Sequence, residues 1–179
     1  MTASVRQHNV RVRQAILDDR SAVVALVPRL RAFGELQFRT AEAHDRAERE
    51  SLERAVANPS ADSVVNVAEL DTLGVVGVAY AYAAIDFCGE RHGYLSILAV
   101  SENAEGRGVG RALIEATEAW ARSMEFRLLA LNVFVANQHA RAVYERVGFA
   151  PDIIRYTKEL TSPASHDATE TGPSPGESR

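Results

Sequence analysis

The stretch AEGRGVGRAL, residues 104–113, decides the fold, and it closely follows the apolar run LSILAV at residues 95–100. It carries three glycines at alternate positions, and glycine loses more conformational freedom on folding than any other residue. A strand, a glycine-rich turn and a helix in this order bring backbone N–H groups and the positive end of a helix to one point. The stretch therefore indicates an anion site. The alternative that it only turns a strand into a helix stays open at this stage.

Two well-known phosphate loops do not fit this stretch. A P-loop ends in Gly-Lys-Ser/Thr, whereas Gly110 is followed by Arg111 and Ala112. The dinucleotide fingerprint would place its last glycine at Arg111 or Leu113, and it needs an acidic residue about 20 positions further on. The apolar run at 128–135 contains no acid. The ligand is therefore neither a P-loop nucleotide nor a Rossmann-bound dinucleotide.

The chain before the glycine stretch reads as helices followed by a sheet. A helix is expected from Asp18 or Asp19 through Leu30, bent at Pro28, which cannot donate a backbone hydrogen bond. A second, polar helix is expected at 41–57. Alternating apolar residues predict strands, which we place at 10–14, 63–69, 75–86 and 94–100. In the strand at 75–86, Val76, Val78, Tyr80 and Tyr82 share one face and small residues share the other, where a helix can pack closely.

The chain after the glycine stretch alternates helix and strand. Apolar residues recur at helical spacing from Val109 to Trp120, and the nearly continuous apolar run at 128–135 predicts a strand covered on both faces. Asn137 begins a short helix that ends at Gly148. A last strand is expected at 153–160.

Composition limits the class of protein. The 179 residues are 46% hydrophobic and 25% charged, which predicts one soluble domain. A net charge of -4 excludes a nucleic-acid groove, and the lone Cys88 and scattered histidines predict no disulfide and no metal. We find no signal peptide and no stretch that spans a membrane, so a cytoplasmic protein is expected. Residues 1–9 are predicted to be flexible, 10–160 to form the domain, and the Pro-rich 161–179 to be a disordered tail.

Four motifs occur in a fixed order: LSILAV (95–100), EGRGVGRAL (105–113), LLALNVFV (128–135) and NQHARAVYERVGF (137–149). In this order they resemble the GNAT superfamily of acyl-CoA-dependent N-acetyltransferases, and the resemblance covers about residues 10–160. It implies an α/β (α+β) single domain. Its central sheet would be mixed but mostly antiparallel, with six to seven strands flanked by about four helices. Acetyl-CoA is the implied cosubstrate, with no metal.

The resemblance also implies which residues contact CoA. Amides of the glycine loop would bind the pyrophosphate, and the strand before it would pair with the pantetheine arm. The implied cofactor-binding residues are Leu98, Ala99, Val100, Gly106, Arg107, Gly108, Val109, Gly110, Arg111, Asn137 and Tyr144. Glu105 departs from the family, which usually has Gln or Arg there, and we expect its carboxylate to point away from the pyrophosphate.

Catalytic residues are harder to assign. Tyr144 matches the family tyrosine that acts as general acid near the CoA sulfur; its alternative role is a core aromatic. The strand at 94–100 offers no acid, so Glu90 and His92 are the candidates for the general base, each with a surface role as the alternative. For the acceptor, the segment between the first two helices offers Phe33, Glu35 and Phe38, which could hold an amine or simply fill the core.

The resemblance predicts an N-acetyltransferase that moves an acetyl group from acetyl-CoA to a primary amine by direct attack through a tetrahedral intermediate. The acceptor could be a small molecule or a peptide or protein. The alternative is a non-catalytic acyl-CoA-binding module, favoured by the missing acid and opposed by Tyr144. The expected partner is an amine acceptor. Whether the protein is a monomer or a homodimer stays open at this stage. Neither nucleic acid nor a membrane is expected.

Overall fold

The computed structural model describes residues 10–34 and 36–160, so the predicted flexible N-terminus and disordered tail lie outside the described residues. Its centre is a sheet whose strands lie in chain order. These strands are β1 (Arg11–Gln14), β2 (Ser63–Leu70), β3 (Gly74–Ile85), β4 (Arg91–Val100) and β5 (Leu129–Leu131). Neighbours from β1 to β4 are antiparallel, and β5 runs parallel to β4. The predicted mixed, mostly antiparallel sheet is confirmed, but it has five strands in the described residues, not six to seven.

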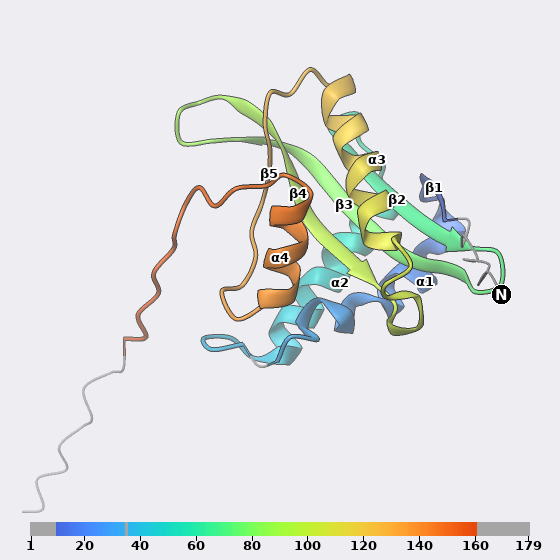
Figure 1. Ribbon diagram of the computed structural model, residues 1–179, viewed down its shortest axis with the longest axis horizontal. Coiled ribbons are helices and arrows are strands. Elements are labelled where there is room, and N and C mark those ends of the chain that lie inside the picture. The colour runs from blue at the N-terminus through green and yellow to red at the C-terminus, as the bar shows by residue number, and fades with distance from the viewer. Residues whose placement is uncertain (1–9, 35, 161–179) are drawn as a thin grey trace, which may run out of the picture.

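Helices cover both faces of this sheet (Figure 1). One face carries α1 (Arg20–Ala25) and α2 (Ala41–Ala57), and the other carries α3 (Val109–Ser123) and α4 (Gln138–Arg146). Three short 3-10 helices complete the fold: η1 (Leu17–Asp19), η2 (Val27–Arg31) and η3 (Glu102–Ala104). Within the described residues, no helix combines the length and the apolar character needed to cross a membrane.

The helix predicted to bend at Pro28 is split in two. α1 ends at Ala25, and η2 takes Pro28 into its first turn, where a missing N–H costs no intrahelical hydrogen bond. This break leaves Leu26 and Val27 buried in the core against β3 and β4. The predicted interruption is therefore confirmed.

The small-residue face of β3 lets α3 pack against the sheet. A Cβ added at Gly77 would lie 2.8 Å from Val109 Cγ1 and 2.9 Å from Leu113 Cδ1, so a side chain there would force both to move. Val76 differs from the expectation, because it packs on the α3 face and not beside Val78. The reason is a register shift against β2 that makes Val76 an extra residue and resets the alternation.

Two expected strands are wrong or shortened. The run at 128–135 forms a ladder only at Leu129–Leu131, and these three residues are half-buried, not covered on both faces. The segment at 153–160 forms no strand and is exposed throughout. Its apolar side chains fit the strand pattern, but a strand also needs a neighbour to pair with, and this segment runs away from the sheet (Figure 1).

A partly buried ionic network joins the first strand to the first helix. The Arg13 guanidinium donates to Asp19 Oδ2 at 2.7 Å and to Glu69 Oε1 at 2.5 Å, linking β1, η1 and β2. Asp19 also accepts the Ile16 backbone N–H at 2.8 Å. The hydrogen bond from Arg13 is the largest cause that lowers the pKa of Asp19. The network fixes where the chain leaves β1 to begin the helical layer.

We predict that Asp19→Asn lowers the free energy of unfolding by about 2 kcal/mol, because it removes a charged acceptor from Arg13. Since the folded-state pKa of Asp19 lies below its unfolded value, this stabilisation is full at neutral pH. This stabilisation is lost as the pH falls from the unfolded-state pKa of an aspartate, about 4, through the lower folded-state pKa. Urea unfolding at several pH values measures the difference. Asp18→Asn is the control because Asp18 is exposed, and an equal loss in both variants would contradict the role of the network.

Candidate functional site

The sheet opens into a fork between β4 and β5. The two strands pair only from Gly93 opposite Leu129 to Leu95 opposite Leu131. Beyond Leu95, β4 continues to Val100 while pairing only with β3. Residues 96–100 therefore present about 16 Å of strand edge that β5 does not cover, at about 3.3 Å per residue. An extended ligand could pair with this edge as a strand would.

A bulge marks the point where the fork begins. Tyr80 of β3 lies opposite Ile97, while Ala81 lies opposite Leu95, which leaves Ser96 as an extra residue in β4. A bulge bends its strand and increases the local twist. β4 thus turns away from the line of β5 at the residue where their pairing ends.

The glycine loop lies at the end of β4. Gly106 has φ +70° and Gly108, the N-cap of α3, has φ +80°, a backbone region that L side chains rarely adopt. Gly110 is different, because it lies inside α3, and an added Cβ would meet only Val100 Cγ2 at an ordinary 3.7 Å. Turning the chain therefore requires glycine at 106 and 108 but not at 110. A glycine that the fold does not need is consistent with a ligand approaching the backbone at this point.

Glu105 is paired with Arg29, a residue that the sequence analysis missed. The Arg29 Nη2 atom donates to the Glu105 carboxylate, and Arg29 Nε donates to the Val100 carbonyl at 3.3 Å. Glu102 lies 3.8 Å from the same guanidinium. Arg29 therefore ties η2 to the end of β4 and balances the negative charge of Glu105 beside the glycine loop.

The other predicted loop residues differ in exposure. Val109 is buried under the sheet, and Arg107 is half-buried. Arg111 points along α3, where it pairs with Glu115 at 2.8 Å. Among the loop arginines, Arg107 has no ion-pair partner in the described residues, so its charge is the one left available to an anion.

Tyr144 and Asn137 come from α4, on the same face as α3. Asn137 caps the helix, because its Oδ1 accepts the Ala140 N–H at 3.0 Å, which confirms the predicted cap. The Tyr144 ring packs edge-on against Phe149 at 5.8 Å, in the cluster that also holds the β4 side chains of Leu98 and Val100. Burial raises the pKa of Tyr144, so its hydroxyl keeps its proton at neutral pH. Tyr144 thus lies on the α3 face of the sheet, in the same cluster as Leu98 and Val100 and with a protonated hydroxyl.

The opposite face of the fork is aromatic. Phe33 stacks on Phe134 with ring centroids 5.3 Å apart, and Phe134 lies 6.2 Å from the His44 ring of α2. Ala99 also faces this side, in the core under α1 and α2. Phe38 is 39% exposed, and Glu35 lies outside the described residues. Of the predicted acceptor residues, Phe33 packs at this face, and Phe134 and His44 join it without having been predicted.

The two candidates for the general base lie in different surroundings. Glu90 belongs to the turn between β3 and β4, where it pairs with Arg127 at 3.0 Å. His92 lies on β4 opposite Ala84, on the face turned away from α3, since a Cβ at Gly93 would point toward that helix. Its Nδ1 is buried and has no hydrogen-bond partner within the described residues. His92 therefore shares a face with the aromatic side of the fork, whereas Glu90 is ion-paired at the hairpin.

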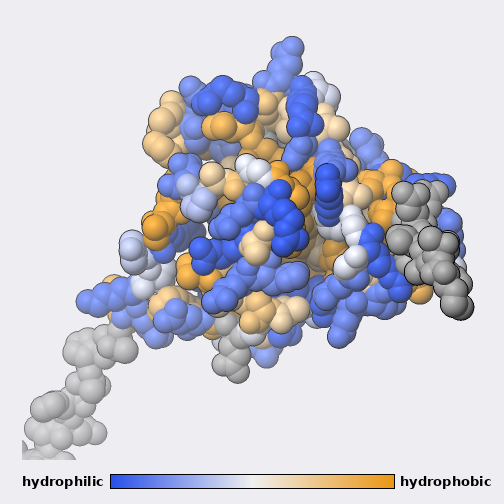
Figure 2. Space-filling model, in the orientation of Figure 1, coloured by the Kyte–Doolittle hydropathy of each residue, from blue (hydrophilic) through white to orange (hydrophobic). Residues whose placement is uncertain are grey.

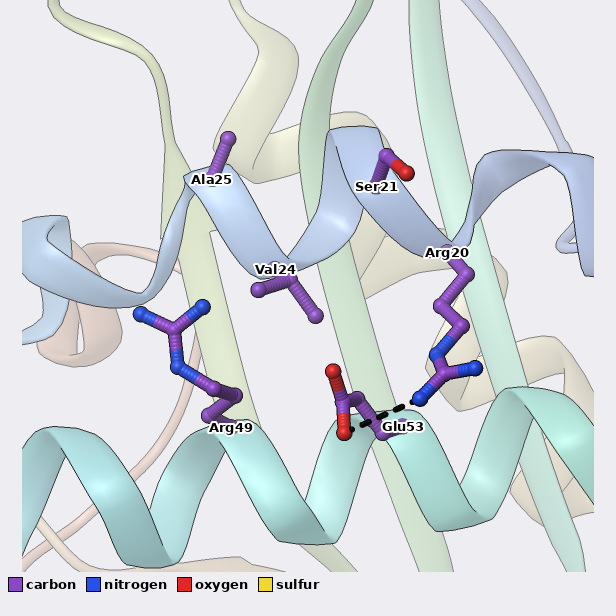
Figure 3. A pocket seen from close by; sticks show the side chains of 6 residues that line it. All are labelled: Arg20, Ser21, Val24, Ala25, Arg49 and Glu53. Atoms are coloured by element: carbon purple, nitrogen blue, oxygen red, sulfur yellow. Dashed lines mark ion pairs between the residues drawn. The ribbon is translucent and has the colours of Figure 1, made fainter.

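Hollows on the surface lie elsewhere. One of about 460 Å³ separates α1 from α2, between Arg49 and the ion pair of Arg20 with Glu53 (Figure 3). Another of about 350 Å³ lies between the end of α3, β5 and the turn at 147–149. Neither is lined by the glycine loop.

On the face that carries α3 and α4, apolar patches alternate with hydrophilic ones (Figure 2). Among residues 10–34 and 36–160, no three metal-binding side chains gather at one point.

Comparisons with known proteins agree with this geometry. The model of the acetyltransferase (GNAT) family matches residues 30–149. The uncharacterized N-acetyltransferase YycN of Bacillus subtilis (strain 168) is 39% identical over 59 residues, which span 33% of this chain and only 38% of that protein. Two solved structures share the fold. Glucosamine-6-phosphate N-acetyltransferase from Arabidopsis thaliana has 20% identity and a TM-score of 0.60, and the match covers 86% of this chain and 99% of the plant enzyme's chain. AAC(6')-Iy in complex with the bisubstrate analog CoA-S-monomethyl-acetylneamine has 20% identity and a TM-score of 0.62, and the match covers 85% of this chain and 99% of the AAC(6')-Iy chain.

We predict opposite effects for alanine at two glycines of the loop. Gly108→Ala should lower the free energy of unfolding by about 1–2 kcal/mol, because its positive φ strains an L residue. Gly110→Ala should be neutral or raise it by up to about 1 kcal/mol, because alanine favours a helix and space exists for its Cβ. Urea unfolding of both variants measures the difference. Equal losses would show that position 110 is also required by the turn.

Proposed function

Because the chain belongs to the acetyltransferase (GNAT) family, whose model matches about two thirds of it, we propose that it transfers an acetyl group from acetyl-CoA to a primary amine. One observation carries the proposal. The uncovered edge of β4 leads directly into a glycine loop at the N-terminus of α3, and Tyr144 packs against the same side-chain cluster as Leu98 and Val100 of β4. The acceptor is a small molecule or the amine of a peptide.

The glycine loop and β4 supply the binding surface for acetyl-CoA. The N–H groups of the loop at 106–110 and the positive end of α3 bind the pyrophosphate, with Arg107 adding charge. The pantetheine arm pairs with the β4 edge at Leu98–Val100, and Asn137 contacts CoA from the start of α4. Arg29 pairs with Glu105 and reduces the repulsion between that carboxylate and the pyrophosphate, which supports binding despite the departure from the family motif.

The reaction is a direct transfer. The nitrogen of the neutral amine attacks the thioester carbonyl carbon, a C–N bond forms, and a backbone N–H of β4 stabilises the oxyanion. The C–S bond then breaks, and the departing thiolate takes the proton of the Tyr144 hydroxyl. The amine nitrogen loses one proton to a general base, for which His92 is the first candidate because it lies on the acceptor face, and Glu90 is the other. Proton exchange with solvent then restores the free base and the Tyr144 hydroxyl. The products are the amide and CoA.

A non-catalytic acyl-CoA-binding module is the competing function. It is favoured by the absence of an acidic side chain on β4, and it predicts binding without release of the CoA thiol. Incubation with acetyl-CoA and amines, followed by thiol titration and mass spectrometry of the amine, separates the two. A stable complex that releases no thiol with any amine would favour the module.

We expect acetyl-CoA at 100 times its Kd to stabilise the folded protein by about 2.7 kcal/mol, seen as a rise in Tm, whereas NAD and ATP should shift it much less. Gly110→Asp should abolish this shift, because it places a side chain and a negative charge at the pyrophosphate site. Gly110→Ala is the matched control for the side chain alone, and it should keep part of the shift. Equal shifts with NAD or ATP would overturn the assignment of the ligand.

We further predict that Tyr144→Phe lowers kcat by about 10²–10⁴-fold, the effect typical of a positioned general acid, while the Tm and the acetyl-CoA shift stay nearly unchanged. The ring and its contact with Phe149 remain, and only the proton donor is lost. Tyr156→Phe is the control, since that tyrosine is 90% exposed. If Tyr144→Phe lowers the Tm and leaves turnover per folded molecule intact, the residue is structural.

A further inference from the structure

The two faces of the fork differ in chemistry, and this difference bears on the acceptor. The glycine loop and Tyr144 lie on the face of α3 and α4, which leaves the face of α1 and α2 for the amine. On that face the rings of Tyr80, Tyr82 and Tyr94 form a ladder with centroids 5.5 and 5.4 Å apart. All three are half-buried. Because Tyr94 lies opposite Ala130, one residue before the pairing of β4 and β5 ends, the ladder leads up to the fork.

One carboxylate without a guanidinium partner faces this region. Glu48 lies on the inner side of α2, one turn before the buried Leu52, and its side chain is 28% exposed. Its one ionic contact in the described residues is with His44 Nε2 at 4.0 Å. Burial raises the pKa of Glu48. The pKa of Tyr94 is also raised, first by burial, then by the charge of Tyr82 and to a smaller extent by the charge of Glu48. Through His44, whose ring lies 6.2 Å from the ring of Phe134, Glu48 is placed next to the aromatic side of the fork.

The other charges nearby are compensated or positive. Asp45, next to His44, is held by Arg31 through bonds of 2.8 and 3.0 Å. Two guanidiniums act on the ladder itself, Arg54 on Tyr80 and Arg155 on Tyr94, where each opposes the rise in the tyrosine pKa. The face thus offers one available carboxylate, aromatic ring faces and two flanking positive charges.

Building on the proposed function, we infer that the acceptor is a monoamine with an aromatic or apolar body. Glu48 binds its single nitrogen as the ammonium, which gives up a proton to solvent before it attacks as the neutral amine. The body lies against the tyrosine ladder and the Phe33–Phe134 pair, and the ring faces also attract the ammonium. A polyamine would bring further positive charges toward Arg54 and Arg155, and the described residues of this face offer no second free carboxylate to meet them. The same charges disfavour polycationic acceptors as a class.

An acceptor comparison tests this inference on the full chain. With acetyl-CoA saturating, phenethylamine should be acetylated with a kcat/KM at least about tenfold above both butylamine, which lacks the ring, and spermidine, which carries additional charges. The readouts are thiol release and mass spectrometry of the acetylated amine. A preference for spermidine would overturn the charge argument, and equal rates for butylamine and phenethylamine would overturn the role of the rings.

Substitution of Glu48 tests the ammonium site. Glu48→Gln keeps the shape and removes the charge, so the KM for phenethylamine should rise about ten- to a hundredfold while the KM for acetyl-CoA stays unchanged. Glu50→Gln is the matched control, the same change on the exposed side of α2, and it should have no effect. Arg54→Glu adds a carboxylate beside the ladder and should improve spermidine as an acceptor. An unchanged phenethylamine KM in Glu48→Gln would refute the assignment.

The acetyl-CoA shift in Tm separates this inference from the function on which it rests. If the wild-type protein shows the shift but acetylates phenethylamine no better than the other amines, the monoamine inference is refuted and acetyl-CoA binding stands. If the shift itself is missing, the proposed function fails and the inference fails with it.

Discussion

The unpaired edge of β4 is the constraint on which the rest of the structure depends. Backbone N–H and C=O groups at a strand edge need partners, and β4 loses those from β5 after Leu95 while it keeps those from β3. The bulge at Ser96 bends the strand at this point and directs its last residues toward the glycine loop. A sheet with β5 paired along the whole of β4 would have no place for an extended ligand between the strands.

Arg29 connects this edge to the helical layer on the other face. Pro28 lies in the first turn of η2, and the next residue of that helix, Arg29, donates to both the Val100 carbonyl and the Glu105 carboxylate. The pair explains how an acidic residue is tolerated next to a proposed phosphate site. A carboxylate that is already paired contributes less negative potential to its surroundings, whereas the first N–H groups of α3, which have no intrahelical acceptor, can bind an anion.

The sequence predicted what local patterns determine and missed what long-range contacts determine. The strands from β1 to β4, α2, the break at Pro28 and the Asn137 cap follow from periodicity, proline geometry and capping. The strand at 153–160 was wrong because alternation defines the faces of a strand but not its neighbour. The Arg29–Glu105 pair joins residues 76 positions apart, so no local pattern indicates it. Glu48 had a usable signal, since it precedes the buried Leu52 by one helical turn.

The register of β3 determines both faces of the proposed site at once. Its small residues, such as Gly77, admit α3 close to the sheet and so set the position of the glycine loop at the start of that helix. The residues that alternate with them, Tyr80 and Tyr82, point to the opposite face and form the ladder with Tyr94. A slip of one residue would exchange the two sets, placing tyrosines under α3 and small residues on the aromatic face. The surfaces proposed for the acyl donor and for the acceptor are therefore specified by the same strand and cannot be shifted independently.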